Sequence, residues 1–412
     1  MREQRKIFEG SNIEKLFMIL MLGCIFLSAL NFIDRYYVFI YLAVLFFLIT
    51  PGRRFTMNSS AVVLVLFSTS MLIFNPSSQT MFTNMLKPFT FPLCYIMGLN
   101  LFVRKEDSMI SLEKEENRVS TLIYILTIGI MIHFLLNMMT NWGASDRNVI
   151  DFWTKDDASA TGQAVLACIM IGVAIAFLFT KVGKLKKTIA IVSLILIIIY
   201  NLILAGRTIF SLIIITTAFA LICTCIFNRN KISKIVITIV VIVLALLILY
   251  SLDVFGIKTM FENSNFYNRF FGGSTSQGVE DDARFEHKLV YLRYFFDFPW
   301  GGGNIRELYG HSAHDLYLDT YDESSIFALI TIVIYIIHSL KRMITCLRTQ
   351  SLTFKTRLLI ACVYMVCNVQ FFLEPIMRGV PWLLASYCFI DGAVTNLLSQ
   401  EKIVRFSALA EN

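Results

Sequence analysis

The chain has 412 residues, of which 57% are hydrophobic and only 16% are charged. A soluble domain is closer to half apolar and a quarter charged, and no soluble-looking block longer than the segment 254–323 interrupts the apolar stretches. This composition excludes a soluble enzyme with a single membrane anchor. We therefore predict an all-α polytopic integral membrane protein with one transmembrane domain over residues 1–412.

The apolar segments define the predicted spans. A helix that crosses a bilayer needs about 20 mostly apolar residues. The twelve candidates are 16–33, 36–50, 60–75, 88–103, 120–139, 162–180, 187–205, 207–227, 235–253, 324–340, 357–374 and 381–399. No small-residue cleavage site follows the charged N-terminus, so we expect the first span to be retained.

Lysine and arginine are unevenly distributed between the loops. The side that holds both termini carries 24 of the 36 Lys and Arg residues, including those that follow the tenth span at 341–357. Because cytoplasmic loops are enriched in these residues, we expect both termini in the cytoplasm. The two long loops, 140–161 and 254–323, are then on the outer face, the second between the ninth and tenth spans. Function is expected there.

The nine cysteines lie in or beside apolar stretches, which argues against a disulfide framework or a zinc site. The cytoplasmic loops contain no phosphate-binding glycine-rich loop, so use of a cytoplasmic nucleotide is not expected.

Arginines stand out on the outer face, where basic residues are otherwise scarce. They are Arg147 in the first long loop, Arg207 at the outer start of a span, and Arg284, Arg293 and Arg306 in the second long loop. A guanidinium group can bind a phosphate through two hydrogen bonds. Two alternatives stay open: Arg207 reaches the lipid headgroups, and Arg147 and Arg284 form solvated pairs with neighbouring aspartates.

His311 and His314 lie where the second long loop meets a helix, in GHSAHDLYLD. A histidine near its ordinary pKa is the usual general base for activating a hydroxyl. One alternative is a metal site in which Asp315 or Asp319 joins the two histidines, and another is a structural histidine hydrogen-bonded within the loop. His287 is expected at the surface.

Two acids lie within or at the end of predicted spans. Asp391 is in the middle of 381–399, and Glu374 is at the outer end of 357–374. Ionisable groups in spans usually face a cavity or a partner. We expect Glu374 to act with Arg378 near the outer site, whereas Asp391 is the feature that favours a proton-coupled transporter.

Four outer segments carry a resemblance to a known family. In chain order they are SDRNVIDFWTKDDASATGQA, AGRTIFSL, DARFEHKLVYLRYFFDFPWGGGN and GHSAHDLYLDTYDESSIFALI. With their sidedness and the long loop before the tenth span, they resemble the O-antigen ligase and polymerase superfamily over most of the chain. The sequence departs from the family where Asp315 replaces the usual Asn, and where Asp322 and Glu323 lie near the place of a usual glycine.

The resemblance implies a GT-C-like glycosyltransferase of the bacterial inner membrane that polymerises repeat units of a surface polysaccharide, an O-antigen or capsule. The donor would be an oligosaccharide on undecaprenyl diphosphate, transferred with inversion and without a metal or other cofactor. The implied catalytic residues are His314 as the base, with Arg284 and Arg207 stabilising the diphosphate. His311 is the alternative base, and we favour His314 because HDLYLD leads straight into the helix. The implied substrate-binding residues are Arg147, His311, Asp315, Arg293 and Arg306.

The resemblance also implies flippase and chain-length regulator proteins as partners in the bilayer, and no nucleic acid. Trp142, Trp153 and Trp300 either line the glycan path or belong to the interfacial aromatic belt. Two other functions stay open. One is a ligase that transfers the lipid-linked glycan to the lipid A core of lipopolysaccharide or to another acceptor, and the other is a membrane transporter.

Overall fold

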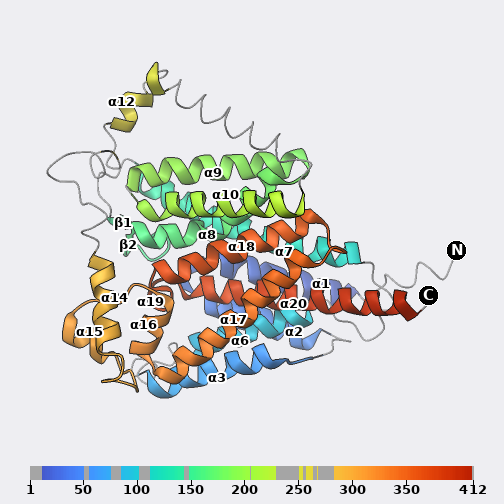
Figure 1. Cartoon of the computed structure of the whole chain (residues 1–412), viewed down its shortest axis with the longest axis horizontal. Coiled ribbons are helices and arrows are strands. Elements are labelled where there is room, and N and C mark those ends of the chain that lie inside the picture. The colour runs from blue at the N-terminus through green and yellow to red at the C-terminus, as the bar shows by residue number, and fades with distance from the viewer. Residues whose placement is uncertain are drawn as a thin grey trace.

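The computed structural model of the chain describes residues 12–50, 55–75, 85–101, 112–142, 148–204, 206–228, 250–253, 257–262, 267 and 283–410. Nearly all regular structure in this part is helical (Figure 1). The first half contains α1 (Asn12–Ala29), η2 (Phe32–Asp34), α2 (Tyr36–Ile49), α3 (Ser59–Phe74), η3 (Lys87–Phe89), α6 (Thr90–Asn100), α7 (Leu112–Thr140), β1 (Asn148–Ile150), β2 (Asp157–Ser159), α8 (Ala160–Phe179) and α9 (Lys184–Leu204). The second half contains α10 (Arg207–Phe227), α12 (Ile257–Glu262), α14 (Ala283–Arg293), α15 (Asn304–Tyr309), α16 (Leu316–Glu323), α17 (Ile326–Arg348), α18 (Phe354–Leu373), α19 (Ile376–Gly379) and α20 (Pro381–Ala410).

Six helices in the described part are long and apolar enough to cross a membrane: α7, α8, α9, α10, α17 and α18. Helices α2 and α3 are also apolar but shorter. Large apolar side chains are exposed along the helix faces, for example Leu48 (61% exposed), Leu66 (54%) and Ile214 (66%). Helices that are apolar on their outer faces need lipid around them. The chain is therefore a helical membrane protein.

A helix coincides with every predicted span that lies within the described residues; the span 235–253 lies largely outside them. Three helices extend well beyond the predicted spans, since α7 begins at Leu112, α17 continues to Arg348 and α20 continues to Ala410. The polar first turns of α7 stay helical because Glu116 has a partner there. Its carboxylate accepts a hydrogen bond from the Thr353 N–H (3.1 Å), which ties α7 to the start of α18.

An antiparallel hairpin of β1 and β2 in the loop 140–161 was not predicted. Its turn is held by Asp151, whose carboxylate accepts a hydrogen bond from the Trp153 N–H (2.8 Å). His133 and Asn137 of α7 contact the same carboxylate at 3.1 and 3.2 Å. The strands have three residues each, too few for an alternating pattern to stand out in the sequence.

Helices α6 and α20 are in backbone contact. A Cβ atom added at Gly98 would lie 2.2 Å from the Phe389 carbonyl oxygen, and one added at Gly392 would lie 2.1 Å from the Tyr95 carbonyl oxygen. Small residues allow such close approach, which is a main source of helix association in membranes. Side chains of both helices belong to a core that extends from Met21 to Leu398.

The segments predicted on the outer face gather at one end of the helix bundle. Helices α14, α15, α16 and α19 and the β hairpin lie there, opposite the C-terminal end of α20 (Figure 1). The α1–α2 turn, the end of α3 and the start of α20 reach the same end, since Asp34, Asn75 and Pro381 line one cavity. We call this end of the bundle the loop end. The described segments that were predicted on one side of the membrane therefore lie together at this end of the bundle.

We predict that Gly98→Ala destabilises the fold by about 1–3 kcal/mol, because the new methyl group forces α6 and α20 apart. Thermal unfolding in detergent measures the change. Gly23→Ala is the matched control: a Cβ atom there meets nothing within 4 Å, and alanine favours the helix by about 1 kcal/mol. Equal unfolding temperatures for the two variants would contradict the backbone contact.

Candidate functional site

A sharp turn precedes α16 and carries His314. Asp315 caps the helix, since its carboxylate accepts hydrogen bonds from the N–H groups of Tyr317 (2.9 Å) and Leu318 (2.7 Å). Aspartate is among the best residues for this role. The prediction that a helix follows His314 is confirmed, but this helix is the short α16, and the predicted span begins separately as α17 at Ile326. His314 has a φ of +59°, which is uncommon for a residue other than glycine.

The turn is also fixed from inside α16. The fully buried Asp319 accepts a hydrogen bond from the Ala313 N–H at 2.9 Å, one residue before His314. The backbone on both sides of His314 is therefore held by carboxylates of α16 and its cap.

Three imidazole rings lie together beside this turn. The ring of His287 stacks on that of His311, with centroids 4.6 Å apart and planes 6° apart, and lies 5.9 Å from the ring of His314. Tyr291 helps to place them by donating a hydrogen bond to the His311 carbonyl at 2.9 Å. We call His287, His311 and His314 the histidine cluster. His287, predicted at the surface, is half-buried within it.

The histidine cluster lies beside the end of α18. Lys288 of α14 donates a hydrogen bond to the Phe372 carbonyl (2.6 Å), and its Nζ lies 3.4 Å from the buried carboxylate of Asp315. The rings of Tyr317 and Phe372 pack 4.8 Å apart. Burial raises the pKa of Asp315, although the Leu318 N–H and Lys288 act against the rise. A cation and a carboxylate thus adjoin the three imidazoles.

Two of the predicted catalytic arginines occupy backbone positions near the histidine cluster. Arg207 is the first residue of α10, and the next residue, Thr208, donates a hydrogen bond to Glu374 at the end of α18 (3.3 Å). Arg284 lies on α14 one helical turn before the histidine that joins the cluster. The side chains of both, and the whole of Arg147, lie outside the described part.

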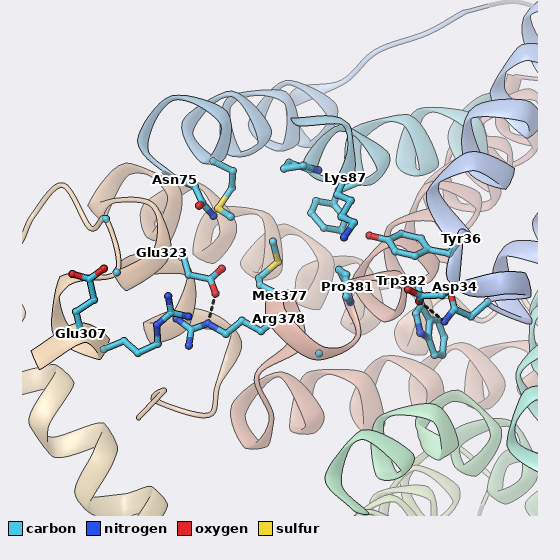
Figure 2. Close-up of a pocket in the computed structure, with 18 residues that line it drawn as sticks. Asp34, Tyr36, Asn75, Lys87, Glu307, Glu323, Met377, Arg378, Pro381 and Trp382 are labelled. Atoms are coloured by element: carbon cyan, nitrogen blue, oxygen red, sulfur yellow. Dashed lines mark hydrogen bonds and ion pairs between the residues drawn. The ribbon is translucent and has the colours of Figure 1, made fainter. Parts of the chain in front are cut away.

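A cavity of about 640 Å³ lies at the other end of α16; we call it the loop-end cavity. It is lined by Asn31, Asp34, Tyr36, Met71, Asn75, Lys87, Pro88, Phe91, Gly302, Gly303, Arg306, Glu307, Glu323, Met377, Arg378, Gly379, Pro381 and Trp382. Figure 2 shows Glu307 on one side and Tyr36 and Trp382 on the other, with Lys87 and Arg378 between them. Since α16 has eight residues, its two ends are about 12 Å apart.

Three consecutive glycines pack against the end of α16. Gly301, Gly302 and Gly303 have φ values of +65°, +80° and +79°, a region open to glycine. A Cβ atom at Gly301 would lie 2.3 Å from the Ser324 carbonyl oxygen. The Gly303 N–H donates a hydrogen bond to the Asp322 carbonyl at 2.6 Å. These glycines bring bare backbone to the cavity wall.

Arg378 pairs with the acidic end of α16. Its guanidinium donates a hydrogen bond to Glu323 (Figure 2) and lies 3.6 Å from the carboxylate of Asp322. Burial raises the pKa of Glu323, and Arg378 opposes the rise. The structure thus corrects the predicted partnership of Arg378 with Glu374, because the side chain of Glu374 instead meets the start of α10.

Three of the five predicted substrate-binding residues belong to these two features. His311 and Asp315 belong with the histidine cluster, and Arg306 lines the loop-end cavity. Arg293 lies on the exposed last turn of α14, beside Tyr309.

The structure describes tryptophans near the loop end, and it also bears on the alternative of a metal site. Trp300 is 58% exposed and stacks on Phe74, and Trp153 donates a hydrogen bond to the Leu30 carbonyl (3.1 Å). Trp382, which the sequence did not single out, lines the cavity. Within the described ranges, no group of three or more His, Cys, Asp and Glu side chains is arranged to hold a metal ion.

Asp391 is buried in an ion pair with Arg342. The Arg342 Nε and the Tyr364 hydroxyl donate hydrogen bonds to its carboxylate at 2.8 and 2.7 Å, and Arg342 also donates one to Ser60 (2.8 Å). The prediction that Arg342 lies in a loop is wrong, because α17 continues to Arg348. The carboxylate of Asp391 joins α17, α18 and α20.

Comparison with models of known protein families gives no match, and neither does comparison with the sequences of curated proteins. What the loop end does is therefore inferred from its residues and their geometry.

We predict that Asp391→Asn destabilises the protein by about 3–5 kcal/mol, because it leaves the Arg342 guanidinium buried without a counter-charge. The free energy of unfolding in detergent measures this. The double variant Arg342→Met, Asp391→Leu removes both charges and should recover most of the loss. Wild-type stability in Asp391→Asn, together with loss of function, would instead indicate a transport role for this acid.

Asp319 gives the loop end a pH dependence. Burial is the main cause that raises its pKa from 3.8 to about 7; Glu323 and Asp315 add to the rise, and Arg378 and the Ala313 N–H oppose it. Because the pKa is raised in the folded state, the protonated carboxyl stabilises the fold fully below about pH 4. This contribution is lost as the pH rises through about 7.

We expect Asp319→Asn, which keeps an acceptor for the Ala313 N–H, to remove this dependence. Between about pH 4 and about pH 7, the wild type should lose on the order of 2–4 kcal/mol relative to the variant. Denaturant unfolding at several pH values measures the difference. The control is Asp156→Asn, at an exposed acid of the β hairpin, which should follow the wild-type profile. Parallel profiles for wild type and Asp319→Asn would refute the assignment.

Proposed function

We propose that the protein is a metal-independent glycosyltransferase that polymerises lipid-linked repeat units of a surface polysaccharide. The observation that carries this proposal is the histidine cluster with Lys288 and Asp315, located where Arg207 begins α10 and Arg284 lies in the first turn of α14. This combination brings candidates for a base and for cations to one end of the helix bundle. The donor is an oligosaccharide on undecaprenyl diphosphate.

We also propose how the protein is arranged in the membrane and which proteins it works with. The chain has twelve spans in a GT-C-like architecture, both termini are in the cytoplasm, and the loop end faces the outer side of the bacterial inner membrane. The protein works beside flippase and chain-length regulator proteins. The apolar helix faces suit a donor that remains in the bilayer.

The reaction needs a base and a place for the charge of the leaving group. The acceptor hydroxyl oxygen attacks the anomeric carbon of the donor from the face opposite the diphosphate. As this bond forms, the bond from that carbon to the diphosphate oxygen breaks, and its electron pair leaves with the diphosphate. His314 takes the hydroxyl proton. Arg207, Arg284 and Arg147 stabilise the negative charge that develops on the diphosphate.

The conformation of His314 supports its assignment as the base. Residues held at uncommon backbone angles cluster at functional sites, and His314 has a positive φ in a turn that Asp315 and Asp319 fix. Aspartate caps a helix as well as asparagine does. The replacement of the family's usual Asn by Asp315 is therefore compatible with the same turn.

The ion pair of Asp391 weakens the transporter alternative. An acid that carries protons through a membrane needs to exchange partners, whereas Asp391 is fully buried between Arg342 and Tyr364. The charges of the loop end, in contrast, border a cavity.

Reconstitution tests the proposal. We expect the purified protein in nanodiscs, given an undecaprenyl-diphosphate-linked repeat unit without metal or nucleotide, to form a ladder of products on a gel. His314→Ala and Arg284→Ala should each lower the rate by about 100-fold or more, through loss of the base and of a diphosphate ligand.

Lys341→Ala serves as the control, since it removes an exposed cation from the half of α17 away from the loop end and should leave the rate unchanged. A single shifted band that forms only when lipid A core is added would make the protein a ligase. Absence of transfer to either acceptor would overturn the glycosyltransferase proposal.

A further inference from the structure

The loop-end cavity lies about one short helix away from the histidine cluster, and the reaction proposed above does not use it. Its volume of about 640 Å³ is in the range of about 300–1,000 Å³ that is usual for ligand sites. Its labelled lining residues are spread from Glu307 to Tyr36 and Trp382, on different elements (Figure 2). A short chain of linked units fits such a space.

The charged groups of the lining balance one another. The described lining has three cations, Lys87, Arg306 and Arg378, and three carboxylates, Asp34, Glu307 and Glu323. The pair of Arg378 with Glu323 is already formed. A ligand with a net charge would meet no excess of the opposite charge in this lining. The lining therefore favours an uncharged ligand.

The same groups favour a ligand with many hydroxyls. A hydroxyl both donates and accepts hydrogen bonds. Lys87 and Arg306 provide donors, Asp34 and Glu307 provide acceptors, and the amide of Asn75 provides both. Hydrogen bonds to charged groups are stronger than those between neutral groups. An uncharged ligand can therefore be held firmly by this lining.

Aromatic rings and bare backbone complete the lining. Tyr36, Phe91 and Trp382 are almost fully buried and contribute small apolar areas to the wall, on which the C–H groups of a sugar can pack. Gly302 and Gly303 contribute backbone without side chains, which lets a bulky ring approach closely.

We propose that the loop-end cavity binds an uncharged oligosaccharide, and that it is the glycan subsite of the transferase. The second statement rests on the proposed function, whereas the first can be tested without any catalysis. The rigid connection through α16 places the bound sugars about 12 Å from the histidine cluster. The repeat unit that the protein handles is then neutral in the segment that occupies this cavity.

The test uses glycans from the cells that carry the protein. Oligosaccharides released from their envelope are separated by anion exchange into uncharged and acidic pools, and each pool is titrated against the protein in nanodiscs. Binding is followed by tryptophan fluorescence, with Trp382→Phe showing which part of the signal arises at the cavity. We expect the uncharged pool to bind. Glu307→Gln and Asp34→Asn should each weaken this binding about tenfold, because each removes a charge-assisted hydrogen bond.

Glu113→Gln makes the same chemical change at an exposed position in the first turn of α7 and should bind like the wild type. Preferential binding of the acidic pool, binding that the cavity variants leave unchanged, or binding of neither pool would each overturn the inference. Product formation without cavity-dependent binding would leave the glycosyltransferase standing and remove the subsite. Binding of the uncharged pool without transfer to any acceptor would support the oligosaccharide site and contradict the glycosyltransferase activity.

Discussion

Hydrocarbon offers no hydrogen-bond partner, and this constraint governs where polar groups lie in the molecule. Inside the bundle, polar side chains satisfy one another, as Arg342 and Asp391 do with the help of Tyr364. The buried His133 likewise contacts the hairpin through Asp151. The remaining charged groups concentrate at the helix ends, where water reaches them. Two long segments of the chain lie at the loop end, so many polar side chains are available there for the histidine cluster and the polar cavity.

A single short helix connects these two features. The cap of α16 forms the turn at His314, and its last residues bind Arg378 and the glycine segment. Asp319, midway along the helix, contacts the turn directly and feels the charge of Arg378 at the other end. Since an eight-residue helix bends little, the position of the cavity and the orientation of the histidine turn are coupled.

Many of the helices were predictable, because long apolar segments report directly on membrane helices. The start of α16 was predictable for a local reason, the capping ability of Asp315. Contacts between distant segments were not. Nothing near His287 indicates that its ring meets His311, and the cavity brings together Lys87, Arg306 and Trp382, which lie far apart in the chain. The partner of Asp391 was missed because Arg342 was assigned to a loop by its charge alone.

The lengths of the helices beside the cavity have a consequence for the surrounding lipid. Helix α2 has 14 residues and α3 has 16, so at 1.5 Å per residue they extend about 21 and 24 Å, against about 30 Å for the hydrocarbon core of a bilayer. Helix α17 is longer, with 23 residues. If α2 and α3 cross the same bilayer as α17, local thinning of the bilayer is one way to match their shorter lengths. The headgroups of the lipids on that flank would then lie closer to the membrane midplane, and a lipid-linked donor of the kind proposed above would present its polar part at a lower level there than in undisturbed membrane.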